Sequence, residues 1–306
     1  MKKMIRKVIQ LAGKTSVVSL PLKWVQKNNI SKGEELEVLD KGNRLIVNKI
    51  GLKPEDLKIT LDINNKHIFD KRYIADLYKR GYDEIYIKYP KIDLASEIKK
   101  SNLLGYEIVD QGKEFCTIKN VSVGLESEFD TMLRRSFRLA KEMALNLEEY
   151  FSGKKVNLEE IRDLEALNNK FTDFCLRLLN KNGYVQNHKT TFLYVIVREL
   201  ESIADIFKYI VDDIRDNKEN ASPKVIKYFI KSKNFFETFY ELFYKFDKEK
   251  FSKFYNIRKG LILEGRQLIK EKGLDGLIAH HSLNLIIATY NLSGPFLTMN
   301  FEEFYQ

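Results

Sequence analysis

Cysteine, proline, tryptophan and histidine are all scarce in this chain of 306 residues. It has two cysteines, five prolines, one tryptophan and four histidines. Cys116 and Cys175 lie far apart and form no CxxC pair, so neither a disulfide-stapled fold nor a cysteine-based zinc site is expected. Hydrophobic residues make up 44% of the chain, which excludes a disordered or collagen-like protein. The length predicts two or three domains at about 100–200 residues each.

Motifs of common catalytic sites are also missing. The histidines form no H-E-x-x-H pattern, and no G-x-S-x-G segment is present. Gly81 and Gly105 stand alone, so there is no glycine-rich phosphate loop. Cys175 follows Phe174 on an apolar helix face and is interpreted as a core thiol. We therefore expect that the protein is not an enzyme.

Long apolar runs are missing as well. The longest such stretch, Leu283–Leu297, is interrupted by Asn284, Asn291 and the Gly294–Pro295 pair. The N-terminal segment is basic and lacks the apolar run of a signal peptide. No membrane insertion is expected. The few cysteines fit a reducing compartment, and the expected location is the cytoplasm.

The charge that is present is unevenly distributed. The chain carries 52 Lys and Arg against 43 Asp and Glu, a net charge of +9. Residues 1–50 hold eleven basic and four acidic side chains, 11 − 4 = +7, which leaves +2 for the other 256 residues. A basic segment on a near-neutral body indicates contact with a polyanion such as DNA. The alternative is a generally lysine-rich surface, and charge alone does not separate the two.

The first 50 residues have the pattern of a small β-rich domain. Strands are predicted over 5–11 and 16–20, a short helix over 22–28, and two further strands over 34–39 and 44–49. The polar segment 40–43 is typical of a hairpin turn. Four such short strands bury little apolar surface, so this domain is expected to pair with a second copy.

Residues 51–122 have the pattern of a small α/β module. Strands are predicted over 58–63 and 82–89, and helices over 71–79 and 94–100. A closing hairpin is predicted from 106–109 and 114–118, around Gln111 and Gly112.

Residues 123–306 are predicted to be helical throughout. Apolar residues recur every three or four positions, and no proline occurs between Pro90 and Pro223. Asn157 and Ser222 are predicted N-caps, and the sixth helix is predicted to stop at Gly294–Pro295. Phenylalanines at 229, 236, 239 and 243 are interpreted as core. Six amphipathic helices with short links predict antiparallel bundles.

The segment from Leu11 to Trp24 (LAGKTSVVSLPLKW), followed by Ile30–Gly33 (ISKG), resembles the SpoVT/AbrB family of swapped-hairpin DNA-binding domains. The resemblance covers about residues 3–50. It implies a homodimer in which two chains interleave hairpins through this N-terminal domain. Domains of this family also serve as antitoxins, so dimerisation without DNA binding is the alternative.

The same resemblance implies DNA contact by basic residues of the first strand and the following loop. On this chain they are Lys3, Arg6, Lys7, Lys14 and Thr15. The family often has arginine near the position of Lys14. Lysine suits phosphate better than bidentate guanine recognition, so we expect this loop to supply backbone affinity rather than base specificity.

The helical half resembles the PhoU family of phosphate-uptake regulators, through Arg198–Asp205 (RELESIAD). That resemblance implies two tandem three-helix bundles with surface metal clusters. Glu201 and Asp205 lie four residues apart and share a helix face, and Glu165 is the matching position on the preceding helix. These three carboxylates are the candidate ligands for surface iron, zinc or another divalent metal, although no cofactor is required. The alternative is an ordinary solvated face of helix charge pairs.

Together, these parts resemble the archaeal phosphate-uptake regulator family over essentially the whole chain. The predicted fold is multidomain α+β: a swapped-hairpin β domain (1–50), a small α/β module (51–122) and a PhoU-like six-helix domain (123–306). The predicted function is a dimeric DNA-binding transcriptional regulator of phosphate uptake, with the helical half as sensor or partner-binding domain. One alternative is an adaptor that contacts a phosphate-transport or signalling protein without binding DNA. Another is a metal-storage or metal-sensing protein.

Overall fold

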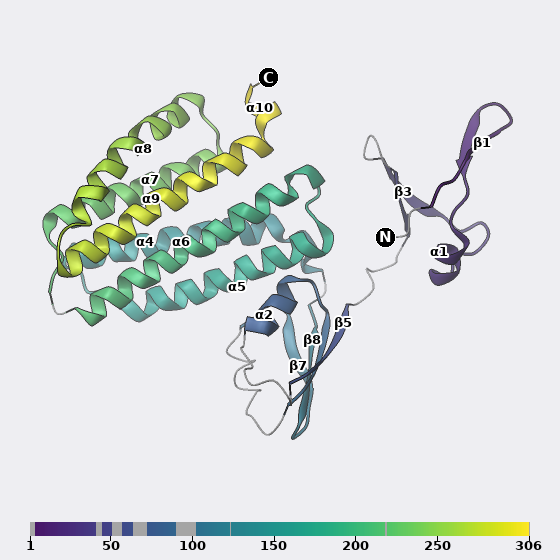
Figure 1. Cartoon of the computed structure of the whole chain (residues 1–306), viewed down its shortest axis with the longest axis horizontal. Helices are drawn as coiled ribbons and strands as arrows, with labels where there is room; N and C mark the ends of the chain where they lie inside the picture. The colour runs from purple at the N-terminus through teal and green to yellow at the C-terminus, as the bar shows by residue number, and fades with distance from the viewer. Residues whose placement is uncertain are drawn as a thin grey trace. The chain divides into compact units, whose positions relative to one another are not determined.

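A computed structural model describes residues 4–40, 45–50, 57–63, 72–89, 102–122, 124–217 and 219–305. The chain divides into two compact units, residues 1–56 and residues 57–306. Figure 1 shows a mixed α+β protein, with small β-sheets in the N-terminal part and a helical C-terminal part. This mixed class was predicted. Each unit is described separately below.

The N-terminal unit holds two separate β-ribbons and one short helix. Strands β1 (Val8–Leu11) and β2 (Thr15–Val18) form an antiparallel pair, as do β3 (Leu36–Asp40) and β4 (Leu45–Lys49). Helix α1 (Leu22–Lys27) follows Pro21, where the proline ends the preceding extended segment. These elements confirm the predicted order. Residues 41–43 of the predicted turn lie outside the described residues.

The second unit begins with a four-stranded sheet in the order β5-β6-β8-β7. Its strands are β5 (Lys58–Asp62), β6 (Glu84–Lys88), β7 (Tyr106–Gln111) and β8 (Phe115–Asn120). Strands β5 and β6 are parallel and joined through α2 (Arg72–Lys79), whereas β7 and β8 form the predicted hairpin. Ile85 and Ile87 alternate toward a fully buried face. The helix predicted over 94–100 lies outside the described residues.

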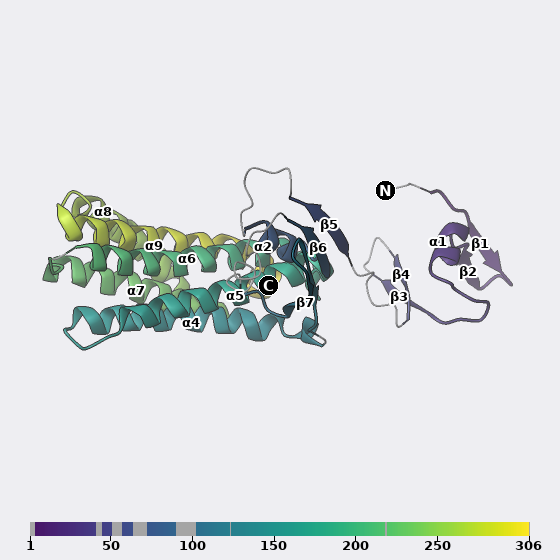
Figure 2. The same ribbon diagram turned by 90° about the horizontal axis from the view of Figure 1, so that it is seen from below.

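Six long helices form most of the second unit. They are α4 (Phe129–Phe151), α5 (Leu158–Asn182), α6 (Thr190–Asp216), α7 (Pro223–Tyr244), α8 (Lys248–Leu268) and α9 (Gly273–Met299). Short 3₁₀ turns η1 (Leu125–Ser127) and η2 (Asn187–Lys189) and the short helix α10 (Phe301–Tyr305) complete the described elements. Figure 2 shows the long helices running side by side. Helices α4, α5 and α6 pack together, as do α7, α8 and α9, and α6 lies against α9.

The core of these helices is the one predicted from apolar spacing. Leu200, Ile203 and Phe207 of α6 are fully buried. So are Phe236 and Phe239 of α7, which confirms the aromatic stripe as core. Within the residues described, no helix combines the length and hydropathy that crossing a membrane requires.

The predicted end of the last long helix is wrong. Helix α9 runs through Pro295 to Met299 instead of stopping at Gly294. Proline in a helix removes one hydrogen bond and strains the preceding turn, at about 3 kcal/mol. Here the turn after it carries Phe296, which is 2% exposed and packs on Phe239 and Phe243. Burial of this ring offsets the local cost.

The two predicted caps have different outcomes. The Asn157 side chain accepts a hydrogen bond from the Glu159 N–H at 3.1 Å, which confirms it as a cap. Ser222 occupies the N-cap position of α7, but its hydroxyl makes no capping bond. Its own N–H instead donates to Asp275 Oδ1 at 2.8 Å, and this hydrogen bond joins the start of α7 to α9.

Candidate functional site

Two of the predicted DNA-contacting residues lie at the β1–β2 turn, Lys14 in the loop and Thr15 at the start of β2. Leu11 pairs with Thr15, so Ala12, Gly13 and Lys14 form the loop, and Lys14 N–H donates to Leu11 O at 3.3 Å. Ala12 and Gly13 have φ of 50° and 71°, the left-handed region that a tight reversal requires. Lys14 and Thr15 are both exposed. The turn therefore holds a lysine at the tip of the ribbon.

Two other predicted contacts, Arg6 and Lys7, lie at the opposite end of the same ribbon. Arg6 and Lys7 directly precede β1 and are exposed, whereas Lys14 follows the far end of that strand. Four strand residues span roughly 13 Å. The structure therefore does not gather these cations into one cluster within one chain. Lys3 lies outside the described residues.

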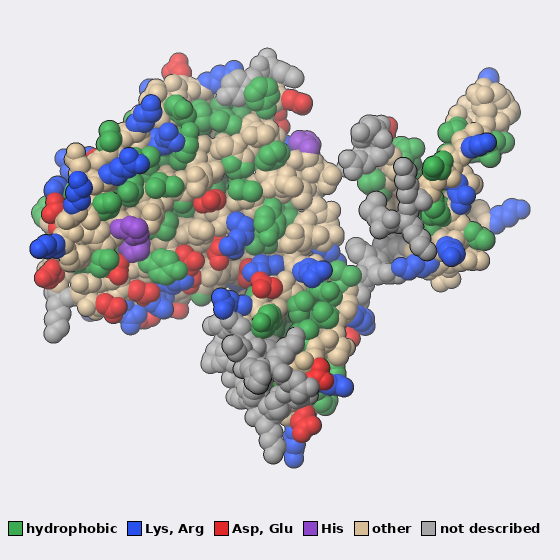
Figure 3. All heavy atoms as spheres, in the orientation of Figure 1, with side chains coloured by type: hydrophobic (Ala, Val, Ile, Leu, Met, Phe, Trp, Pro, Cys, Tyr) green, Lys and Arg blue, Asp and Glu red, His purple; other side chains and the backbone are tan. Residues whose placement is uncertain are grey.

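Large apolar side chains accompany these cations on the surface. None of residues 4–40 and 45–50 is buried. Figure 3 shows hydrophobic and basic side chains together on the visible face of this unit. The large apolar residues that are exposed here are Met4, Ile5, Val8, Ile9, Leu11, Val18, Leu20, Leu22, Val38, Leu39, Leu45, Ile46 and Ile50. The described part of the unit has no hydrophobic core of its own.

The basic residue Lys49 makes contacts within this unit. Lys49 Nζ lies 2.9 Å from Glu34 Oε1 and donates to the carbonyl oxygens of Asn28 and Asn29. These bonds tie β4 to the end of α1. By contrast, no acidic side chain among the described residues forms an ion pair with the predicted contacts Arg6, Lys7 or Lys14.

The predicted metal-ligating carboxylates lie on α5 and α6. Glu165 is 8% exposed, and its Oε1 accepts from Lys208 Nζ at 2.7 Å. The same ammonium donates to Asp205 Oδ1. The lysine thus occupies the position between two carboxylates where a cation is expected. Burial alone lowers the pKa of Lys208, but its hydrogen bonds to Asp205 and Glu165 outweigh burial and raise it, so the lysine stays charged.

Glu201, the third predicted ligand, is paired separately. Arg198 Nη1 lies 2.8 Å from Glu201 Oε2, one turn earlier on α6. Burial raises the pKa of Glu201, and the nearby Asp205 adds to this effect. Among the described residues, no three His, Cys, Asp or Glu side chains are grouped so that they could hold a metal ion. On this face, each of the three predicted ligands therefore has a basic side chain as its ion-pair partner.

Asp173 on α5 was missed in the sequence, although it is the most perturbed carboxyl on this face. Burial raises its pKa to about 6, against the attraction of Lys79, whose Nζ lies 3.8 Å away. Its side chain is 20% exposed. The sequence marks Asp173 only by its position two residues before Cys175, which is interpreted as a core thiol. The cause is tertiary, since Lys79 belongs to α2.

This shift has a definite effect on stability. Below about pH 4 both the folded and the unfolded chain hold the Asp173 proton. The stability that comes from the neutral form of this buried carboxyl is then fully present. As pH rises through about 6 the folded chain must ionise a buried carboxyl, and the contribution is lost. We expect Asp173→Asn to be more stable than the parent at pH 8 by up to about 2–3 kcal/mol, and similar to it at pH 4.

Thermal unfolding of both proteins between pH 4 and 8 measures this difference. Asp163→Asn, an exposed change on the same helix, should give a difference that does not vary with pH. A pH-independent difference for Asp173→Asn as well would contradict the assignment.

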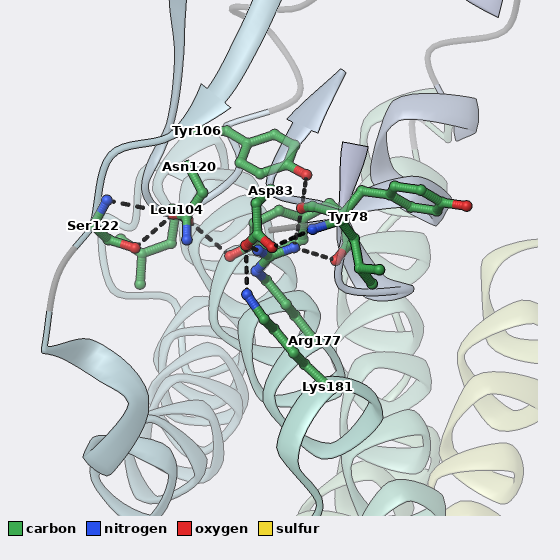
Figure 4. A network of polar contacts seen from close by, with 10 residues as sticks. Tyr78, Asp83, Leu104, Tyr106, Asn120, Ser122, Arg177 and Lys181 are labelled. Atoms are coloured by element: carbon green, nitrogen blue, oxygen red, sulfur yellow. Dashed lines mark hydrogen bonds and ion pairs between the residues drawn. The ribbon is translucent and has the colours of Figure 1, made fainter. Parts of the chain in front are cut away.

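A buried ionic network joins the sheet to the helices (Figure 4). Arg177 of α5 and Asp83, just before β6, are 4% and 7% exposed, and Arg177 Nη2 lies 2.6 Å from Asp83 Oδ1. Arg177 Nη1 also donates to the carbonyl oxygens of Tyr78 and Tyr82 at 2.9 and 2.5 Å. Lys181 contacts the same carboxylate oxygen at 2.5 Å. The α/β module is therefore fixed to α5 by charge as well as by packing.

Comparisons of the chain with protein-family models, with curated proteins and with solved structures find no match.

Proposed function

We propose that the protein is a dimeric DNA-binding regulator, with the N-terminal unit as the DNA-binding part and the helical unit as its sensor or partner-binding part. The observation that carries the proposal is the combination of exposed cations and exposed apolar side chains in the N-terminal unit. Exposed apolar side chains mark a surface that packs against another protein surface, and exposed cations mark a surface that binds a polyanion.

A second copy of the same unit is the partner that the strands favour. Side chains alternate between the two faces of a ribbon, so Val8 and its neighbour Val18 lie on one face, and Ile9 and Val17 on the other. A two-stranded ribbon with apolar residues on both faces is at best marginally stable in water. Interleaving with a second ribbon pair would cover both faces. It would also double the number of cations on one surface.

The regulation of phosphate uptake is the more specific part of the proposal. It rests on the resemblance to phosphate-uptake regulators, and the packing of α4–α6 and of α7–α9 into neighbouring triplets is compatible with it. The helical unit would then contact a phosphate-transport or signalling protein. The non-DNA adaptor remains the alternative.

Binding of duplex DNA by the full chain should depend steeply on salt. Each phosphate that a basic side chain neutralises adds about 0.9 to the slope of log K against log salt. We expect the charge reversal Arg6→Glu/Lys7→Glu to weaken binding by about tenfold or more and to make the slope shallower by about 0.9 for every phosphate no longer neutralised. Fluorescence anisotropy with labelled duplexes at salt concentrations from about 50 to about 300 mM measures both quantities.

Lys253→Glu/Lys259→Glu on α8 is the matched control, because it makes the same change in net charge at two exposed positions of the helical unit. It should leave the slope unchanged. A flat slope for the parent protein would remove DNA from the proposed function and leave the adaptor. Equal weakening in both variants would remove the N-terminal unit as the DNA-binding part.

A further inference from the structure

The helical unit contains an open cavity that none of the preceding sites uses. Its volume is about 840 Å³. It is lined by residues from the start of α4 and of α6, from the ends of α7 and α9, and from α5. This volume lies in the usual range for sites that bind small molecules, about 300–1,000 Å³.

One wall of the cavity is strongly cationic. Arg134, Arg135 and Arg138 lie close together on the same face of α4, are exposed and line the cavity. None of the three forms an ion pair with an acidic side chain among the described residues. Arginine presents a planar set of donors that matches a phosphate group. A set of three without acidic partners is therefore a fitting site for a phosphate.

The remaining charges of the lining are already engaged. Lys189 Nζ donates to Asn300 Oδ1 at 2.8 Å and lies 3.0 Å from Glu303 Oε1. Asp130 accepts a hydrogen bond from the hydroxyl of Tyr184 at 3.2 Å. This one carboxylate opposes an anion, but the three arginines outnumber it. The net charge of the lining thus favours an anionic ligand.

The interior of the cavity is aromatic. Phe171, Tyr184, Phe243, Tyr244 and Phe296 all contribute to the lining. The Tyr244 hydroxyl is buried, and its polar neighbour is Arg134, whose guanidinium lies 4.5 Å from the centroid of the Tyr244 ring. A buried hydroxyl among edge-to-face rings can recognise a polar group on a planar ligand.

We propose that this cavity binds an organic phosphate that carries an aromatic ring, of the nucleotide class. The phosphate lies against Arg135 and Arg138, and the ring lies among the aromatic side chains near the Tyr244 hydroxyl. The phosphate alone leaves the aromatic interior unused, and an uncharged ring leaves the arginines without an anion. Both parts of the ligand are therefore required for full affinity.

Isothermal titration calorimetry of the full chain with the four common ribonucleoside 5′-monophosphates tests the proposal without DNA, so the result does not depend on the proposed function. We expect at least one to bind with a Kd below about 1 mM, and its nucleoside and inorganic phosphate to bind about tenfold or more weakly. Arg135→Gln/Arg138→Gln should weaken binding of the nucleotide by about tenfold or more. Thr131→Trp, which fills the cavity from an exposed position on α4, should also abolish binding while keeping every arginine.

Arg266→Gln, on the exposed face of α8, is the control and should bind as the parent does. Unfolding temperatures of all variants establish that they are folded. The proposal is overturned if no nucleotide binds below about 1 mM, if inorganic phosphate binds as tightly as the nucleotide, or if the folded arginine variant keeps the parent affinity.

Discussion

Arg177→Met should destabilise the unit of residues 57–306 by about 3–5 kcal/mol. The substitution preserves most of the side-chain volume but removes the guanidinium from Asp83, which is 7% exposed. It also leaves the carbonyl oxygens of Tyr78 and Tyr82 without the donor that they now share. For a unit of this size the destabilisation corresponds to about 6–20 °C in unfolding temperature, which calorimetry of the full chain measures.

Arg215→Met is the matched control for this change. Arg215 pairs with Glu159 at 2.6 Å, but both side chains are about half exposed, and such pairs contribute about 0–1 kcal/mol. The double variant Arg177→Met/Asp83→Leu should recover part of the stability, because neither Arg177 nor Asp83 is then left as a lone buried charge, but Lys181 loses the carboxylate that it contacts. Recovery should be incomplete, since Asp83 Oδ2 also accepts from Leu57 N–H at 3.0 Å. An Arg177→Met destabilisation below about 1 kcal/mol, similar to the control, would show that the network does not hold the sheet on α5.

Most of the fold could be predicted from local spacing. The apolar stripe of α6, from Leu193 to Ile214, repeats every three or four residues and is buried, and the β7–β8 hairpin follows from its alternating residues. The rule that proline ends a helix failed at Pro295 because packing of Phe296 outweighs a local penalty, and nothing in the local sequence shows that packing.

The contacts within the candidate sites were harder to predict, because the residues that pair there are distant in sequence. Lys208 reaches Glu165 across 43 positions, and Arg177 reaches Asp83 across 94. No spacing rule connects such pairs. The arginines at 134, 135 and 138 were not singled out from the sequence, although their shared helix face is visible there. Their lack of acidic partners and the aromatic half of the cavity needed the structure.

If the proposed dimer forms through interleaved ribbons, Ile9→Glu should convert it to a monomer. Ile9 is 53% exposed in one chain, and in an interleaved pair of ribbons its face would be covered by the second copy. A carboxylate buried there without a partner would weaken association by about 10²–10³-fold. Sedimentation analysis should find the parent at twice the chain mass of 36.0 kDa and the variant at the chain mass at micromolar concentration.

Gln26→Glu supplies the control, because it adds the same charge to the same unit at an exposed polar position of α1, outside both ribbons. It should remain dimeric. A parent protein that is monomeric at these concentrations would contradict interleaving directly, since its ribbons would then expose both apolar faces to water. An Ile9→Glu variant that stays dimeric would place the interface outside the N-terminal unit. In that case the exposed cations of two copies would not be held on one surface, and the dimeric DNA-binding part of the proposed function would lose its physical basis.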